Sequence, residues 1–392
     1  MKRLLTLAFI ASLVAGVAPA MADDVSVRYE STPDEAVLYL GDLVYVRDTV
    51  SLPPGDVTVT FPATVIADSL IVSEDGARVR LLRFRNAARS VAVADPWSSA
   101  MSVPIEASPL AVSWPSEATE TREVVLEYLA RGASWRPLYD MTVLDEETVR
   151  FAFTAEIVNY TLALDDAAVK LVSGMVGGDS EAYAAMMTMA QNALGYENVV
   201  NFERPEVGQI SAHHVYDLGA VTMLPGETVR VSMVDEMLDA RRIIAWDTRQ
   251  GERTEVIYKV ANTSAFPFSE GMVRAYEDGI YLGTDAIEWT PSGSEGSVTV
   301  AGMSDVRVRR QESVEEIAAR GGVDEYRHEV TLEIGNYGGE DITLAVLDPW
   351  PNRAVEFSFS AEPSRQPGNI FRWDVDAPAG ERVTITYTFY TD

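Results

Sequence analysis

The sequence predicts an all-β protein of tandem antiparallel β-sandwich modules, immunoglobulin-like in kind, with one or two short inserted helices. Short runs of alternating apolar and polar residues recur along the chain, and Gly, Pro, Asn and Asp separate them at close intervals. In residues 383–389 the odd positions are apolar and the even positions are threonine, which is the period of a half-buried strand. Val25–Tyr29, Val256–Val260 and Val330–Ile334 alternate in the same way. A parallel α/β sheet would need helices between these strands.

The N-terminus has the layout of a secretory signal. Lys2 and Arg3 precede an apolar run from Leu4 to Val17, and Ala20-Met21-Ala22 supplies a cleavage site, so we expect residues 1–22 to be removed. This predicts a protein exported to the periplasm or the extracellular space, with a retained N-terminal anchor as the alternative. No later run approaches the ~18 apolar residues of a membrane helix, so no transmembrane segment is expected after cleavage.

Removal of the first 22 of 392 residues leaves 370, which is enough for two to four domains. We expect an N-terminal β domain over residues 23–112, followed by a linker around Trp114-Pro115-Ser116. A middle sandwich with a helical insertion is expected over residues 118–240, and a C-terminal sandwich over residues 241–392.

The composition excludes several classes of partner. The net charge of −29 argues against nucleic acid, because phosphate contacts need clustered positive charge. With no cysteine, the chain has neither disulfides nor thiolate metal ligands. Only three lysines occur, which fits either adaptation to high salt or codon usage. Loose binding of divalent cations to the acidic surface is a further expectation.

Two short motifs repeat. A proline-glycine turn with an acidic residue precedes an alternating strand at Pro54-Gly55-Asp56, Pro225-Gly226-Glu227 and Pro378-Ala379-Gly380-Glu381. Other strands end at Asn159, Asn262 and Asn336, and asparagine favours a turn at such positions. We interpret these as corresponding corners of related modules.

Helical patterns are scarce. Residues from Ser180 to about Leu194 place methionine and other apolar residues on one helical face. Ser313 with Glu316 forms a capping-box pattern, and Gly321 would end a short helix there.

Several segments together resemble a family of bacterial and archaeal proteins, of which the mucoidy inhibitor A proteins are named members. The likeness is carried by Ala133–Asp140, Ala155–Thr161, Lys170–Gly174, Gly271–Gly279 with Gly283, Val306–Arg309, and Trp373 ahead of Pro378–Glu381. Ala36–Phe84 is similar to the smaller β domain that often precedes this region. The resemblance implies a β-rich envelope or secreted protein and supplies no catalytic residues to transfer.

Two departures limit this resemblance. After Asn159 the family usually has a turn with glycine and tryptophan, and Thr161–Asp166 has neither. Many members carry a long coiled coil between the two domains, whereas residues 86–118 show no heptads.

No pattern for catalytic, cofactor-binding or metal-binding residues is found, and we predict no enzyme and no cofactor. His213 and His214 point to opposite faces if they lie on a strand, and His328-Glu329 lacks a second histidine four residues on. The acidic pairs Asp23-Asp24, Asp165-Asp166 and Glu315-Glu316 are more typical of solvated turns than of a glycosidase.

One basic segment stands out. Arg78, Arg80, Arg83 and Arg85 alternate with apolar residues, and the phase changes between Leu81 and Leu82 as in a β-bulge. These arginines are the candidate binding surface for an anionic polysaccharide or an acidic protein. The alternative interpretation is an exposed strand whose charges prevent edge pairing.

The function predicted from these observations is binding or scaffolding by a non-catalytic protein of the cell envelope or extracellular space. Its partner would be a protein or polysaccharide of the envelope. The alternative is a carboxylate-dependent hydrolase that acts on envelope polysaccharide, for which a cleft with two converging carboxylates would be needed.

The charge leads to a test of salt adaptation. Repulsion within a chain of net charge −29 should weaken as the Debye length falls from ~30 Å at 0.01 M salt to ~3 Å at 1 M. We expect the melting temperature to rise steadily with sodium chloride. Calcium at specific sites would instead give a saturating gain that sodium at equal ionic strength does not reproduce. A melting temperature that changes with neither sodium chloride nor calcium would contradict both salt adaptation and specific calcium sites.

Overall fold

The computed structural model describes residues 25–86, 109–173, 206–210, 213–317 and 325–391. These residues form two compact units. Unit 1 comprises the residues up to Asp34 together with Val46–Ala130, and unit 2 comprises Glu35–Tyr45 and the described residues from Arg131 onward. The expected signal segment 1–22 and the helix expected between residues 180 and 194 lie outside the described residues.

Unit 1 is a sandwich of two groups of strands. One group has the order β1 (Val25–Arg28), β4 (Val57–Phe61), β8 (Leu110–Trp114) and β7 (Arg83–Asn86). The other has the order β3 (Val44–Leu52), β9 (Arg122–Ala130), β5 (Ile71–Glu74) and β6 (Ala77–Arg78), and a 3₁₀ turn, η1 (Ala67–Ser69), precedes β5. Phe61 of β4 and Tyr128 of β9 pack with their ring centroids 6.1 Å apart, so the two groups share one core.

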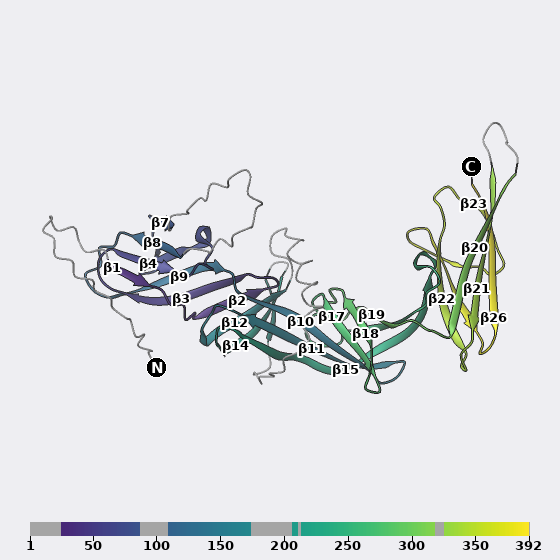
Figure 1. Ribbon diagram of the computed structural model, residues 1–392, viewed down its shortest axis with the longest axis horizontal. Coiled ribbons are helices and arrows are strands. Elements are labelled where there is room, and N and C mark those ends of the chain that lie inside the picture. The colour runs from purple at the N-terminus through teal and green to yellow at the C-terminus, as the bar shows by residue number, and fades with distance from the viewer. Residues whose placement is uncertain (1–24, 87–108, 174–205, 211–212, 318–324, 392) are drawn as a thin grey trace, which may run out of the picture. The chain divides into compact units, whose positions relative to one another are not determined.

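Unit 2 contains most of the strands labelled in Figure 1. Its longest sheet has the order β18-β17-β10-β11-β15-β22-β25-β24, and β16 joins β15 to β19. A second sheet has the order β20-β21-β26-β23, and β14 pairs with both β12 and β13. The bounds are β2 (Glu35–Tyr39), β10 (Ala133–Val143), β11 (Thr148–Asn159), β12 (Leu164–Ser173), β13 (Glu206–Ile210), β14 (His213–Met223), β15 (Glu227–Asp247), β16 (Glu255–Ala261), β17 (Gly271–Glu277), β18 (Ile280–Ile287), β19 (Glu295–Ala301), β20 (Val306–Glu316), β21 (Tyr326–Asn336), β22 (Ile342–Pro349), β23 (Val355–Phe359), β24 (Ser364–Gln366), β25 (Ile370–Ala377) and β26 (Arg382–Thr391), with the 3₁₀ turn η2 (Thr248–Gln250).

The all-β prediction is confirmed, since the described residues contain strands, turns and two 3₁₀ turns but no α-helix. The same residues include no helix with the length and apolar character to cross a bilayer. Not every ladder is antiparallel, however. The pairs β1 with β4, β2 with β12, β10 with β17, and β15 with β22 run parallel. The long crossovers that parallel pairs need contain further strands here.

The prediction of a helix after the capping-box pattern is wrong for the part of this segment that the structure describes. Ser313 and Glu316 lie in β20, opposite Glu329 and Tyr326 of β21. An uninterrupted ladder along the whole of β20 outweighs the local preference of one serine for a helix start. Gly321 lies outside the described residues.

The boundaries of the two compact units differ from the module boundaries that the turn residues in the sequence indicated. Trp114, expected in a linker, is a buried residue of β8 opposite Val57. Unit 1 continues to Ala130, because β9 pairs with β5. At residue 240 the chain does not turn, since β15 continues unbroken from Glu227 to Asp247.

Three parts of unit 2 repeat one strand pattern. In each repeat a first strand leads into an asparagine, an antiparallel pair of strands is inserted, and a return strand pairs antiparallel with the first. In repeat one, β11 is the first strand, β12 and β14 are the inserted pair, and β15 is the return strand. In repeat two, β16 is the first strand, β17 and β18 are the inserted pair, and β19 is the return strand. In repeat three, β21 is the first strand, β22 and β25 are the inserted pair, and β26 is the return strand.

The asparagines at these positions are buried and make equivalent hydrogen bonds. Each Nδ2 donates to two carbonyl oxygens, one of which belongs to a residue three or four positions later and the other to the residue directly before the proline of the return turn. The acceptor pairs are Leu162 and Leu224 for Asn159, Phe266 and Thr290 for Asn262, and Glu340 and Ala377 for Asn336, at 2.7–3.2 Å. We call each such arrangement an asparagine corner.

The cores are rich in aromatic side chains. Trp135 and Trp373 are 1% and 4% exposed. In repeat three, Trp373 packs with Phe371 and Tyr387, and the indole Nε1 donates to the carbonyl of Ala361. This cluster holds the sheet of β20, β21 and β26 against that of β22 and β25.

The asparagine corner of repeat two provides a stability test. Asn262 is fully buried, and its Oδ1 accepts bonds from the backbone N–H and the hydroxyl of Ser264. Asn262→Ala should lower the free energy of unfolding by about 2–4 kcal/mol, because buried polar groups lose their partners. Asn262→Asp should cost at least as much, since a carboxylate would face the carbonyl oxygens of Phe266 and Thr290.

Denaturant unfolding of purified variants measures these losses. Asn352→Ala, between β22 and β23, is the control: its Oδ1 accepts a bond from Asn369, but the site is exposed and water replaces that bond, so stability should change by less than about 1 kcal/mol. Wild-type stability in Asn262→Asp would show that the amide donors are not needed.

Candidate binding surface

The four arginines singled out in the sequence do not share one strand. Arg78 ends β6, Arg83 and Arg85 lie in β7, and Arg80 lies in the connection 79–82 between them. The predicted bulge falls in this connection and is therefore wrong. The change of phase arises because the chain passes here from one strand group of unit 1 to the other.

All four arginine side chains are exposed. None of them forms an ion pair with another residue in the described parts of the chain. Arg136 and Arg310, by contrast, bond the buried carboxylates of Glu156 and Asp348. On a chain of net charge −29, uncompensated guanidinium groups so close in sequence are unexpected. We call these four residues the arginine patch.

A hollow of about 650 Å³ adjoins the patch, at the margin of the unit 1 core. It is lined by Arg78 and Arg80 and by the apolar side chains of Leu70, Val79, Leu82 and Phe84. Leu70 is the lining residue that the sequence did not indicate, because it lies before β5 and nothing local links it to the arginines.

The ladder between β7 and β8 explains why Phe84 faces the hollow. Phe84 pairs with the buried Val112, whereas Arg83 pairs with the half-buried Ser113. Residues opposite each other across a ladder share a face of the sheet, so Phe84 points to the core side and Arg83 and Arg85 point outward. Phe84 is nevertheless 45% exposed, because β7 is the last strand of its sheet.

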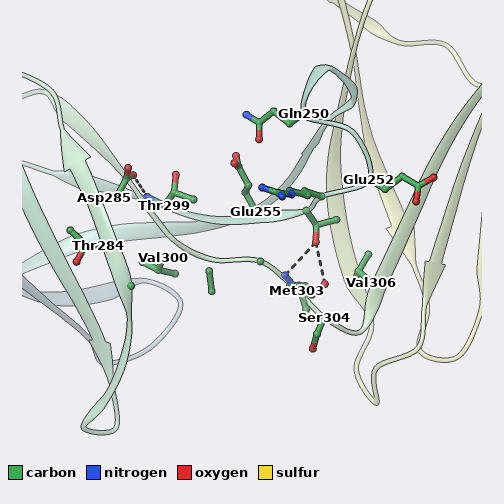
Figure 2. A pocket seen from close by; sticks show the side chains of 15 residues that line it. Gln250, Glu252, Glu255, Thr284, Asp285, Thr299, Val300, Met303, Ser304 and Val306 are labelled. Atoms are coloured by element: carbon green, nitrogen blue, oxygen red, sulfur yellow. Dashed lines mark hydrogen bonds between the residues drawn. The ribbon is translucent and has the colours of Figure 1, made fainter. Parts of the chain in front are cut away.

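A larger pocket, of about 830 Å³, lies in unit 2 beside β18 and β19. Figure 2 shows Asp285 and Glu252 at opposite ends of it, with Glu255 between them. Asp285 Oδ2 accepts the backbone N–H of Thr299 at 2.6 Å, so this carboxylate connects β18 to β19. The lining combines polar and apolar groups in similar amounts, and the pocket is about as open to solvent as the hollow beside the arginine patch.

Other residues considered from the sequence do not come together. His214 contacts the ring of Trp289, and burial lowers its pKa. His328 stacks on Phe389 and bonds Glu312 and Thr391. In the described part of the chain, no three His, Cys, Asp or Glu side chains are grouped to hold a metal ion.

The acidic pairs are placed differently from a glycosidase site. Asp165 and Asp166 are exposed at the start of β12, and Glu315 and Glu316 are exposed at the end of β20. Asp23-Asp24 lies outside the described residues.

A buried carboxyl group in unit 1 has a shifted pKa. Asp48 of β3 is 2% exposed and accepts hydrogen bonds from the hydroxyl of Tyr29 at 2.6 Å and the backbone N–H of Thr32 at 3.3 Å. Burial raises the pKa of Asp48 to about 6, although the Tyr29 hydrogen bond opposes this. Burial also raises the pKa of Tyr29 and of Tyr128, which lies beside it. The cluster fixes the segment between β1 and β2 to the core.

The shift in Asp48 predicts how stability changes with pH. The pKa is about 6 in the folded protein and 3.8 in a free side chain, so the folded state holds this proton more strongly. The free energy of unfolding should therefore fall as the pH rises from about 4 to 6, by up to ~3 kcal/mol. Asp48→Asn removes this dependence, so the stability difference between variant and wild type should grow in favour of the variant over that range.

Urea unfolding at pH 4, 5, 6 and 7 checks this. Asp68→Asn, at an exposed carboxylate of unit 1 that does not contribute to the Asp48 shift, serves as the control and should leave the pH dependence almost unchanged. A stability difference between Asp48→Asn and wild type that stays constant over the four pH values would contradict the raised pKa.

The sequence can be compared with models of known protein families. Residues 124–392 match the model of a family described as a domain of unknown function, DUF4139. The match covers more than half of the chain and includes the three repeats with their asparagine corners. No curated protein matches the chain. Ala36–Phe84 lies outside the matched residues, and the link to mucoidy inhibitor A proteins stays a prediction. The chain belongs to the DUF4139 family.

Proposed function

We propose that this chain is an exported, non-catalytic protein that binds an anionic partner of the cell envelope or extracellular space through the arginine patch. The observation that carries the proposal is the patch itself, four exposed guanidinium groups without carboxylate partners in the described residues of a strongly acidic chain. Guanidinium groups recognise carboxylates and phosphates through paired, charge-assisted hydrogen bonds. The partner class that fits is an acidic polysaccharide or an acidic protein surface.

The net negative charge does not prevent such binding. At physiological ionic strength the Debye length is about 8 Å, so a polyanion at the patch responds mainly to nearby charges. Glu74, a neighbouring carboxylate, already forms an ion pair with the buried Arg122. Two further carboxylates, Asp75 and Glu117, line a hollow together with Glu74 and Arg80, so the four guanidinium groups of the patch outnumber the three carboxylates of that hollow.

Export is supported by the signal-like N-terminus, and a scaffolding role by the linked repeats of unit 2. The resemblance to mucoidy inhibitor A proteins points to the same compartment. For the rival, a carboxylate-dependent hydrolase, the pocket beside β18 offers Glu255 and Asp285. Asp285 is engaged by a backbone N–H, and hydrolysis needs an acid and a base that converge on one bond.

Charge reversal tests the proposed function. Polygalacturonate, a polymer of sugar acids, should bind the wild-type protein more weakly as sodium chloride rises, and neutral dextran should not bind. Replacement of all four patch arginines by glutamate should weaken binding of polygalacturonate at least tenfold, because attraction becomes repulsion. Titration calorimetry at 0.05 and 0.5 M sodium chloride gives both comparisons.

The matched control is Arg307→Glu/Arg309→Glu, a pair of exposed arginines two residues apart on β20. It replaces two arginines and not four, so it changes the net charge in the same direction by half as much, and it should leave affinity within about twofold. Equal losses of polygalacturonate affinity in the control and patch variants would show that binding depends only on the net charge of the protein. Release of reducing ends from the polymer by wild type, abolished in Glu255→Gln or Asp285→Asn, would favour the hydrolase.

A further inference from the structure

The hollow beside the arginine patch lies at the open edge of the unit 1 sandwich. β6 ends one strand order and β7 ends the other, so each lacks a neighbour on one side among the described strands. The connection 79–82 joins these two edges, and the hollow lies along it. An apolar group that enters here reaches side chains which belong to the core.

The lining divides into two chemical parts. Leu70, Val79, Leu82 and Phe84 are apolar, and Leu70 is buried. Arg78 and Arg80 are exposed and charged. A volume of about 650 Å³ falls within the range of small-molecule sites. Apolar side chains on one part of the lining and two guanidinium groups on the other match a ligand that is itself amphiphilic.

We propose that this hollow binds a single-chain amphiphile with an anionic head group, such as a fatty-acid carboxylate. The hydrocarbon chain packs on Leu82 and Phe84 at the open edge, and the head group pairs with Arg78 and Arg80. Removal of Phe84 from water adds a favourable term that a purely polar polyanion does not gain. The proposal rests on the arginine patch as an anion site and assigns a distinct ligand to the part of the patch that lines the hollow.

The two halves of the patch supply an internal control. Arg83 and Arg85 do not line the hollow, and the β7–β8 ladder places them on the opposite face from Phe84. A polysaccharide bound along the outside uses Arg83 and Arg85. An amphiphile in the hollow uses Arg78 and Arg80 and does not need the other two.

The experiment is titration of the full-length protein with dodecanoate and dodecyl phosphate below their micelle concentrations. Acetate and inorganic phosphate test the head groups alone, and a neutral dodecyl maltoside tests the chain alone. We expect at least one of the two charged amphiphiles to bind at least tenfold more tightly than its head group or the neutral amphiphile. Binding of neither charged amphiphile overturns the proposal, and so does equal binding of the neutral one.

Variants then locate the site. Arg78→Glu/Arg80→Glu should weaken amphiphile binding at least tenfold, and Arg83→Glu/Arg85→Glu should leave it within about twofold. Phe84→Ala, at an exposed position that tolerates truncation, should weaken amphiphile binding but leave polygalacturonate binding unchanged. Melting curves confirm that each variant is folded. An unchanged affinity in Phe84→Ala and Leu82→Ala would overturn the proposal, whereas retained binding of polygalacturonate would leave the proposed function standing.

Discussion

The asparagine corner is the constraint on which the architecture of unit 2 depends. Each repeat must leave its first strand, complete an inserted pair of strands, and return beside the first strand. The amide of Asn159, Asn262 or Asn336 bonds the carbonyl immediately before the return turn, at sequence separations of 65, 28 and 41 residues. One buried side chain thus fixes the point of return whatever the length of the insertion. Because a buried amide without partners is costly, the corner tolerates few alternatives.

The repeats are joined to one another by strand pairing, so they are not structurally independent. β17 of repeat two lies parallel to β10, and β22 of repeat three lies parallel to β15. β15 itself pairs with β11 near its start and with β16 near its end. Asp348 of β22 is fully buried and accepts bonds from Thr248, Arg310 and Tyr387. These donors come from η2, β20 and β26, so the charge is compensated only when η2 and β20 have come together with repeat three.

The alternation of apolar and polar side chains was enough to predict the strands from the sequence. The sequence did not show which strands pair with each other over long distances along the chain. The sequence indicated the asparagines and two of the three return turns, but Pro291-Ser292-Gly293 was missed because its glycine is followed by serine and not by an acidic residue. Ser313 to Glu316 read as a helix start because the pattern is local, while the ladder to β21 is not. Trp114 read as a linker residue because Pro115 follows it, although its indole is buried. The arginines were visible as a segment, but Leu70 joins them only through the fold.

The candidate binding surface lies where the repeated framework is absent. In unit 1 the turn at Pro53 and Gly55 is held by the guanidinium group of Arg122, which donates to both carbonyls, and not by an asparagine amide. Arg122 in turn pairs with Glu74 at the end of β5. In the connection 79–82 the Val79 N–H still donates to the carbonyl of Val72 in β5, and residues 80–82 then pass to β7 outside any strand. The side chains of this connection are therefore under less constraint from pairing, and a connection on a rigid sandwich is where binding residues are commonly carried.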